Sequence, residues 1–237
     1  MSPRKVDPRV RSLLVEVAAR ILTEEGPQAL SARRVAGEAG ISTMPVYTHF
    51  NGMSGLVREI VHEGFARMQS SFSLVRRSDD PVTDMAVLGR AYRQNALANP
   101  HLYAVMFGGS SLASFELSEA DRQHGRYTLS SVIECAKRCI AAERFTVTDP
   151  ELVAHQMWSA THGVVTLELG GYLVPPYDSD SCFERQLIGL MVGAGDTFAA
   201  ATRSVEVSRL LYRGEPASSR PGQAAGDAPG HRAQACG

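Results

Sequence analysis

The chain has 237 residues, of which 44% are hydrophobic and 21% charged, and its formal net charge at pH 7 is -1. A chain of this length can bury a substantial core, and a net charge near zero excludes a protein that coats nucleic acid without sequence preference. No apolar run is long enough to span a bilayer and no signal-peptide core follows the N-terminal charges, so we expect a cytoplasmic protein without membrane contact.

The first predicted helix begins at Pro8 and ends before Gly26-Pro27. Apolar side chains recur in it at helical spacing and mark one amphipathic face. That face comprises Val10, Leu13, Leu14, Val17, Ala18, Ile21 and Leu22. Residues 1–55 carry seven basic and five acidic side chains, so this end of the chain is its more basic part. A local basic excess on an otherwise acidic chain favours a reader of specific DNA sites over a bulk binder.

Residues 31–50 predict two short helices joined by a tight turn. Ser31 is a typical N-cap for the first helix, because its hydroxyl can accept a hydrogen bond from a free backbone N–H. Gly40 ends that helix, since glycine takes the left-handed conformation without steric cost. A second N-cap is predicted at Ser42, and Pro45 fits the first turn of the second helix, where a missing N–H has no partner to lose. This arrangement is a helix-turn-helix.

The second helix has an apolar and a polar face. Val46 and Phe50, four residues apart, share the face that packs inward. The opposite face presents Thr43, Met44, Tyr47 and Thr48. Hydroxyls hydrogen-bond phosphates and base edges, and a methionine packs on a thymine methyl, so this face favours the major groove of DNA. An ordinary helical hairpin with a polar outer face is the alternative.

At these residues the chain resembles the DNA-binding domain of TetR-family transcriptional regulators. The resemblance covers residues 8–60 and rests on Val35-Ala36-x-x-Ala39-Gly40-Ile41-Ser42, Pro45-Val46-Tyr47-x-His49-Phe50 and Leu56. It implies a homodimer that reads a palindromic operator in double-stranded DNA. The predicted DNA contacts are Ser31, Arg33, Ser42, Thr43, Met44, Tyr47, Thr48 and His49. Met53 stands where many members have a phosphate-binding Lys or Arg, so other basic residues would take over that contact.

A long helix is predicted to follow Asn51-Gly52 and to run to Phe72. Its apolar stripe, long enough to leave one domain and enter the next, comprises Leu56, Val57, Ile60, Val61, Phe65, Met68 and Phe72. We therefore expect this helix to link the domains mechanically. The predicted domains are a three-helix DNA-binding domain at 1–55, a larger helical domain for ligand binding and dimerisation at 56–213, and a disordered tail rich in Gly, Pro, Ala and Ser at 214–237.

The remaining pattern is helical throughout, which predicts an all-α fold. Helices are expected at about 82–99, 115–144, 150–170 and 183–211, with Asp149-Pro150 as a strong helix start. The last of these has a broad apolar stripe that includes Leu190 and Phe198, together with small residues for close helix approach. It and the helix around 158–169 are therefore the predicted dimer interface.

The second half of the chain carries a further resemblance. Two motifs resemble the C-terminal ligand-binding domain of one branch of TetR-like regulators. They are Trp158-x-x-x-His162-Gly163 and Asn99-Pro100-His101, which leads to Met106-Phe107-Gly108. The predicted cavity wall comprises Phe65, Met68, Phe72, Tyr103, Met106, Phe107, Met157, Trp158 and His162. Since these residues carry few charges, an apolar or aromatic small-molecule effector is expected, with His162 or Tyr103 as its polar anchor.

No catalytic residues, metal site or cofactor are predicted, and the chain is expected not to be an enzyme. Glu59-x-x-His62 has the spacing of half a di-metal carboxylate site, but a second copy is missing. A small helical metalloenzyme is therefore the weaker alternative. A second alternative keeps the helix-turn-helix and makes the C-terminal domain an adaptor for a protein partner, in which case a flat apolar patch would replace the cavity.

Overall fold

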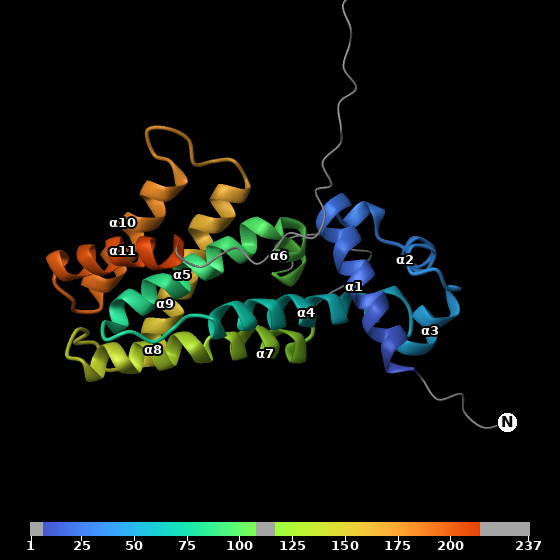
Figure 1. The fold of residues 1–237 in the computed structure, drawn as a ribbon, viewed down its shortest axis with the longest axis horizontal. Coiled ribbons are helices and arrows are strands. Elements are labelled where there is room, and N and C mark those ends of the chain that lie inside the picture. The colour runs from blue at the N-terminus through green and yellow to red at the C-terminus, as the bar shows by residue number, and fades with distance from the viewer. Residues whose placement is uncertain (1–6, 108–116, 214–237) are drawn as a thin grey trace, which may run out of the picture.

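The computed structural model describes residues 7–107 and 117–213, and within these ranges every regular element is a helix. The elements are α1 (Pro8–Glu25), the short 3-10 helix η1 (Pro27–Ala29), α2 (Ala32–Glu38), α3 (Met44–Phe50), α4 (Met53–Ser73), α5 (Pro81–Ala98), α6 (Pro100–Met106), α7 (Glu119–Thr128), α8 (Ser130–Ala141), α9 (Pro150–Leu169), α10 (Ser179–Gly193) and α11 (Phe198–Arg213) (Figure 1). The predicted all-α fold is confirmed. The predicted tail at 214–237 lies outside the described residues.

Local signals position the first two helices as predicted. Pro8 opens α1, and the Ser31 hydroxyl caps α2 by accepting a hydrogen bond from the Arg34 N–H at 3.2 Å. Gly40 follows α2 with a φ of 68°. Its N–H donates to the Gly37 carbonyl at 3.1 Å and the next N–H, that of Ile41, to Ala36 at 3.0 Å, so α2 ends in a Schellman motif.

The start of α3 differs from the prediction. Its N-cap is Thr43, not Ser42, and no side chain caps it. The Schellman motif extends the hydrogen bonding of α2 as far as Ile41, so the chain cannot begin a second helix at the next residue. The first intrahelical bond of α3 instead runs from the Val46 N–H to the Thr43 carbonyl at 3.1 Å, and Pro45 lies in the first turn as predicted.

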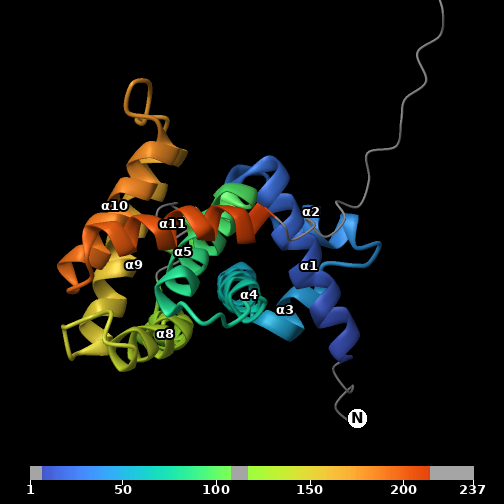
Figure 2. The same ribbon diagram turned by 60° about the vertical axis from the view of Figure 1, so that its left-hand side comes forward.

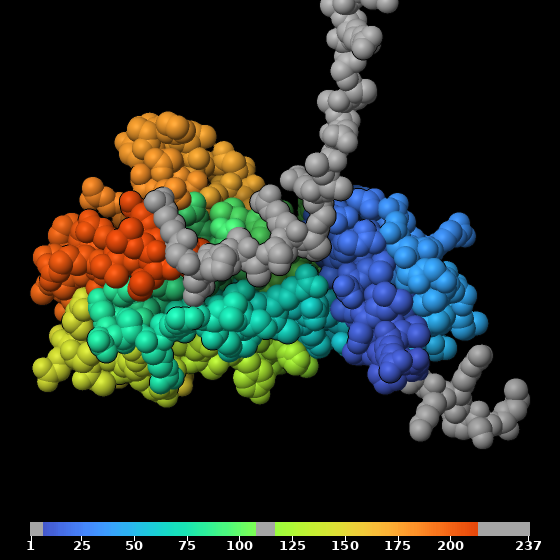
Figure 3. Space-filling model, viewed as in Figure 1, coloured from blue at the N-terminus to red at the C-terminus, as the bar shows by residue number. Residues whose placement is uncertain are grey.

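Helix α4 connects the two halves of the molecule. All seven residues of its predicted apolar stripe are buried. Its first half packs against α1 and α3, and it continues against α5, α6, α7 and α8 in the larger part (Figures 1 and 2). In the space-filling view, α1 to α3 gather at one end of the molecule and the α9–α10 connection projects from the other part (Figure 3). Because α4 is continuous across residue 55, the domain boundary there stays a prediction.

The helix predicted at 115–144 is two helices, α7 and α8, and Phe115 lies outside the described residues. The break is at Leu129, a buried residue whose N–H donates to the Arg126 carbonyl three residues back at 3.1 Å. The Thr128 hydroxyl also donates to the Gly125 carbonyl at 2.6 Å. Both bonds tighten the last turn of α7 and turn the chain into α8.

The helix predicted at 183–211 is likewise two helices, α10 and α11, and α10 begins earlier, at Ser179. The chain breaks at Gly195, whose φ is 115° and whose backbone lies so close to Thr146 that a Cβ would meet the Thr146 Oγ1 at 2.1 Å. The Ala194 carbonyl accepts from the Thr146 and Val147 N–H groups, at 2.9 and 3.1 Å. Phe198, predicted in a buried stripe, consequently opens α11 and is 61% exposed.

Within residues 7–107 and 117–213, no helix is long and apolar enough to cross a membrane.

Candidate DNA interface and effector cavity

Helix α3 has one buried and one exposed face. Val46 and Phe50 are buried in the core, whereas Met44 is 64% and Tyr47 57% exposed. Met44 and Tyr47 lie three residues apart on α3, so together they form one exposed apolar and phenolic surface of the kind that interfaces use. Thr43 and Thr48 are exposed beside them.

The other predicted DNA contacts surround this face. Ser31, Arg33 and Ser42 are exposed, although the Ser31 hydroxyl is already engaged in capping α2. His49 is half-buried, and its Nδ1 is buried with no hydrogen-bond partner among the described residues. Met53, at the first position of α4, is half-buried against the core and carries no charge. The structure thus exposes all of the predicted set except His49.

Three of the five arginines in the described residues 7–55 form ion pairs. Arg20 of α1 pairs with Glu38 of α2 at 2.7 Å, and Arg34 of α2 pairs with Glu25, the last residue of α1, at 2.7 Å. Both ion pairs hold α1 against α2. Arg11 pairs with Glu59 on α4. Among residues 7–55, only Arg9 and Arg33 have no carboxylate partner in the described structure, and both are exposed. That such residues take over the phosphate contact that Met53 cannot make stays a prediction.

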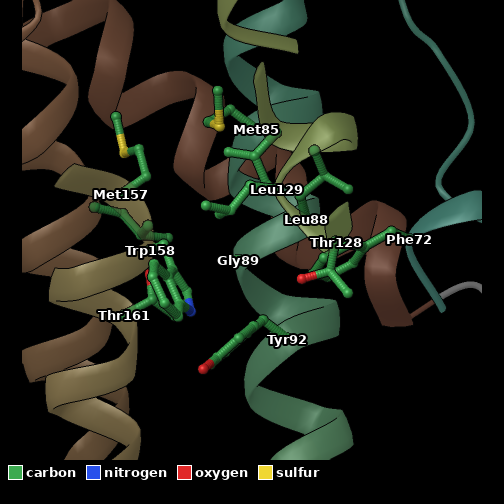
Figure 4. A pocket seen from close by; sticks show the side chains of 12 residues that line it. Phe72, Met85, Leu88, Gly89, Tyr92, Thr128, Leu129, Met157, Trp158 and Thr161 are labelled. Atoms are coloured by element: carbon green, nitrogen blue, oxygen red, sulfur yellow. The ribbon is translucent and has the colours of Figure 1, made fainter. Parts of the chain in front are cut away.

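An apolar cavity lies in the larger part of the molecule, between α4, α5, α9, α10 and the junction of α7 and α8 (Figure 4). Its lining residues are Phe72, Met85, Leu88, Gly89, Tyr92, Thr128, Leu129, Val132, Met157, Trp158, Thr161 and Leu187. The break between α7 and α8 places Leu129 in this wall. Phe72 comes from the last turn of α4, so the cavity touches the helix whose other end packs against α3.

The cavity is small as it stands. Its volume is about 30 Å³, whereas an engineered apolar cavity of about 150 Å³ accepts a benzene-sized molecule. Any effector must therefore displace side chains. Met85 and Met157 line the cavity, and unbranched methionine side chains change conformation at low cost. The site is thus able to open around an apolar molecule.

A cluster of two tyrosines and a histidine adjoins the cavity. The Tyr103 Oη lies 2.6 Å and the Tyr92 Oη 3.0 Å from the His162 Nδ1, and the two hydroxyls are 3.0 Å apart. Burial raises the pKa of Tyr103 to about 12 and raises that of Tyr92, while burial lowers the pKa of His162. All three groups are therefore neutral at pH 7. A neutral imidazole that accepts at Nδ1 carries its proton on Nε2, which leaves one N–H donor for a ligand.

The nine predicted cavity residues fall into three groups. Phe72, Met157 and Trp158 line the cavity itself. Tyr103, Phe107 and His162 form the adjoining aromatic cluster, in which the Phe107 ring centroid is 4.6 Å from His162. Phe65, Met68 and Met106 are buried outside the cavity lining, where Phe65 meets Phe107 edge-on and Met106 packs against Gly64.

Sequence reasoning missed the contribution of α5 to the wall. Met85, Leu88, Gly89 and Tyr92 recur at helical spacing, and a glycine among large side chains on one face could have indicated a hollow. The signal is weak because every residue in the first two turns of α5, polar Thr83 and Asp84 included, is buried.

A buried carboxylate ties α7 to α4. Asp121 is fully buried and accepts hydrogen bonds from the Ser118 N–H and hydroxyl, at 2.8 and 2.6 Å. Across to α4, its oxygens lie 2.8 Å from the His62 Nε2 and 3.3 Å from the Arg58 Nε. These donors outweigh the effect of burial and lower the pKa of Asp121 to about 2. Because α7 ends at the cavity with Thr128, one short helix connects the cavity wall with the half of α4 nearest α3.

The residues proposed for a metal site have other partners. Glu59 pairs with Arg11, and His62 bonds Asp121. Within the described parts of the chain, no group of three or more His, Cys, Asp or Glu side chains could hold a metal ion.

Comparisons with known proteins agree with this geometry. Residues 14–60 match the family described as bacterial regulatory proteins, tetR family, and residues 85–190 match the tetracyclin repressor-like C-terminal domain. The second region contains the Trp158-x-x-x-His162-Gly163 motif. The assignment of this motif to one branch of the family stays a prediction. An uncharacterised HTH-type transcriptional regulator of Mycobacterium tuberculosis is 28% identical over 189 residues, which cover 77% of this chain and 80% of that protein.

Solved structures share the fold. A protein of unknown function from Rhodococcus sp. RHA1 has a TM-score of 0.67 at 22% identity, over 82% of this chain and 98% of its own. RolR in complex with the ligand resorcinol has a TM-score of 0.64 at 16% identity, over 84% of this chain and 93% of its own. With the helix-turn-helix at one end and a ligand-binding type of helical domain behind it, the chain belongs to the TetR family of non-enzymatic transcriptional regulators.

Proposed function

We propose that the protein is a homodimeric repressor that leaves a palindromic operator when a small apolar or aromatic molecule enters the cavity between α4, α5 and α9. One observation carries this proposal: the cavity is walled by Phe72 of α4, and the other end of α4 packs against α3. A concave apolar cavity between helices favours a small molecule over the protein-adaptor alternative, for which a flat exposed patch would be needed.

The chemistry of the cavity supports an effector with an apolar or aromatic body. RolR, which shares the fold, has been solved with resorcinol. In the present chain, an apolar wall adjoins two phenols and an imidazole, so an aromatic body would be held by burial and a polar substituent by Tyr103 or His162. The remaining predicted wall residues, Phe65, Met68, Met106 and Phe107, would then support the cavity without touching the ligand.

The switch would run through α7 and α4. A ligand that pushes on Thr128 and Leu129 displaces the end of α7, whose other end holds α4 through Asp121. A ligand shifts an equilibrium only by its difference in affinity for the two states, so a hundredfold loss of operator affinity requires about 2.7 kcal/mol of preference for the state that does not bind DNA.

The operator can be found by footprinting the DNA that flanks the gene of this protein and its neighbours. We expect one protected palindrome with half-sites about one helical turn, roughly 34 Å, apart. Protection of scattered, unrelated sequences would contradict the proposal. Protection that responds to a protein partner but to no small molecule would favour the adaptor alternative.

Replacement of Tyr47 with alanine is expected to weaken operator binding by about 1–3 kcal/mol, because the exposed phenol loses a hydrogen bond to the DNA. The fold should hardly change, since the Tyr47 side chain is largely outside the core. Anisotropy of a labelled operator measures the affinity, and chemical denaturation measures the stability. If Tyr47→Ala binds normally while Val46→Ala, which alters the buried face, does not, the faces of α3 have been assigned wrongly.

The dimer interface is expected on α9 and α10. Their exposed faces share a shallow hollow that includes Ser159, Ala160, Gly189 and Gly193, and a Cβ added at Gly189 or Gly193 would meet nothing within 4 Å. Small side chains with open space above them allow close approach of a second helix pair.

Gly189→Glu tests this interface without disturbing the subunit, because the added side chain has free space in its own chain. We expect sedimentation to show a folded monomer for the variant and a dimer for the wild-type protein at micromolar concentration. A wild-type monomer, or a variant that still forms the dimer, would remove the predicted interface.

Gly89→Ala is expected to separate stability from effector binding. The added methyl would lie at 3.4 Å from Leu187 and 3.5 Å from Phe183, which is ordinary contact, and it would occupy part of the cavity. Alanine in place of a helical glycine should stabilise the fold by about 0.5–1 kcal/mol, while effector affinity should fall. A variant that is more stable but binds the effector as well as wild-type protein would place the ligand elsewhere.

A further inference from the structure

A second hollow adjoins the effector cavity at the end of α4. Its volume is about 360 Å³, and Phe72 and Leu88 line both spaces. Figure 4 shows these two side chains on the side of the cavity opposite Met157 and Trp158. Two apolar side chains that can change rotamer, Phe72 and Leu88, therefore lie where the small inner cavity meets the larger outer hollow. Together the two spaces fall within the range of typical ligand sites, about 300–1,000 Å³.

The outer hollow differs from the inner cavity in charge. Arg76, Arg77 and Arg138 line it, together with the carboxylates of Asp84 and Glu134. Arg138 is neutralised, because its Nη1 lies 2.6 Å from the Asp84 Oδ2. Glu134 is also paired, because its Oε2 lies 3.8 Å from the Lys137 Nζ.

Arg76 and Arg77 remain as two cations at the rim of this hollow. Both are exposed, and neither has a carboxylate partner among the described residues. Guanidinium groups hold carboxylates and phosphates by paired, charge-assisted hydrogen bonds. The charge that would complement this hollow is therefore an anion.

We propose that the effector is an amphipathic organic anion, with an apolar body in the inner cavity and a carboxylate or phosphate group at Arg76 and Arg77. This inference rests on the proposed effector function of the cavity. Rotation of Phe72 and Leu88 joins the two spaces, so a molecule too large for the inner cavity alone is accommodated along both. Burial supplies affinity for the body, and the arginines select the charged end.

The position of the two arginines has a mechanical consequence. Helix α4 ends at Ser73, and Arg76 and Arg77 follow it within one turn's length. A head group held there would act on the C-terminal end of α4, and the apolar body would act on Phe72 of the same helix. The N-terminal half of α4 packs against α3. Both parts of the ligand would thus bias the orientation of α4.

The single tryptophan of the chain, Trp158, lines the inner cavity, so its fluorescence reports entry of a ligand body. The probes are straight-chain alkyl carboxylates of six to twelve carbons and alkanols of the same lengths, titrated into the full-length protein. We expect the best carboxylate to bind about tenfold or more tightly than its matched alkanol, since the charged end gains hydrogen bonds to guanidinium groups. The preference should fall with rising salt.

Two double variants locate the head group. Arg76→Gln/Arg77→Gln should abolish the preference for the carboxylate and leave alkanol affinity unchanged. Arg122→Gln/Arg203→Gln removes two other exposed arginines, on α7 and α11, and should keep the preference. A preference that survives in Arg76→Gln/Arg77→Gln would overturn the inference.

The inference and the proposed function fail in different ways. Equal affinity of carboxylates and alkanols for the wild-type protein would overturn the anionic effector and leave an apolar effector in place. If neither series changes the fluorescence of Trp158, both the inference and the effector role of the cavity are overturned.

Discussion

Gly55→Ala is expected to abolish operator binding by unseating α3 from α4. A Cβ at this position would lie 1.7 Å from the Phe50 carbonyl oxygen and 2.8 Å from its carbon, and both are backbone atoms. Backbone cannot rotate away as a side chain can, so α3 and α4 must separate at the point where they touch. We expect a loss of about 3 kcal/mol in the stability of the DNA-binding part, at the upper end of overpacking costs.

Gly37→Ala is the matched control for that experiment. Gly37 is a helical glycine as well, in α2, but a Cβ there meets nothing within 4 Å. It should bind the operator normally and gain up to about 1 kcal/mol in stability. Chemical denaturation and operator anisotropy measure both variants. Normal operator affinity in Gly55→Ala would show that the junction of α3 and α4 is not as close as described.

Asp121→Ala is expected to cost about 3 kcal/mol of folding free energy and to uncouple the cavity from the operator. The change removes the carboxylate that accepts from Ser118 and from His62 and Arg58 on α4. Truncating one member of a buried charged network leaves its partners unsatisfied. Glu119→Ala is the control: Glu119 is exposed on the same helix, and its ion pairs there should contribute little.

The coupling is read from operator affinity with and without effector. In Asp121→Ala the effector should still bind the cavity, as Trp158 fluorescence reports, but it should change operator affinity several-fold less than in wild-type protein. An Asp121→Ala protein with full stability and full response would exclude α7 as the connection between cavity and α4.

The pH dependence of stability gives an independent check on Asp121. Its pKa in the folded protein is about 2, below the 3.8 of a free side chain, so ionised Asp121 favours the folded state by about 2 kcal/mol. A lowered pKa means that this contribution is complete above pH 4 and is lost as the pH falls through 2. The stability difference between wild type and Asp121→Asn should therefore be constant from pH 5 to 8 and shrink between pH 4 and 2.

Signals that act within a few residues were predictable from the sequence. Ser31, Gly40 and the Asp149-Pro150 pair fix helix ends through their own backbone and hydroxyl chemistry, and each does so in the structure. The breaks at Leu129 and Gly195 were not predicted. At Gly195, contact with Thr146 and the ion pair between Arg144 and Asp196 come from a segment about 50 residues earlier in the chain, which periodicity cannot reveal.

The cavity was predictable only in part for a similar reason. Phe72 could be inferred from the apolar stripe of α4, and Met157 and Trp158 from the sequence motif at 158–163 in α9. In α5, by contrast, every residue from Pro81 to Leu88 is buried, so the sequence shows no face that distinguishes the core from the cavity wall. The hydrogen bond between Asp121 and His62 joins residues 59 positions apart in the chain. The only local sequence signal at Asp121 is the capping box that it forms with Ser118, so its contact with α4 could not be predicted.

The central claim is that occupation of the cavity lowers operator affinity through α4. It is tested most directly by measuring operator affinity at saturation with whichever apolar or amphipathic compound changes Trp158 fluorescence most strongly. The account predicts operator binding about a hundredfold weaker in the saturated protein, equivalent to about 2.7 kcal/mol of coupling. Unchanged operator affinity while Trp158 reports full occupancy would contradict it.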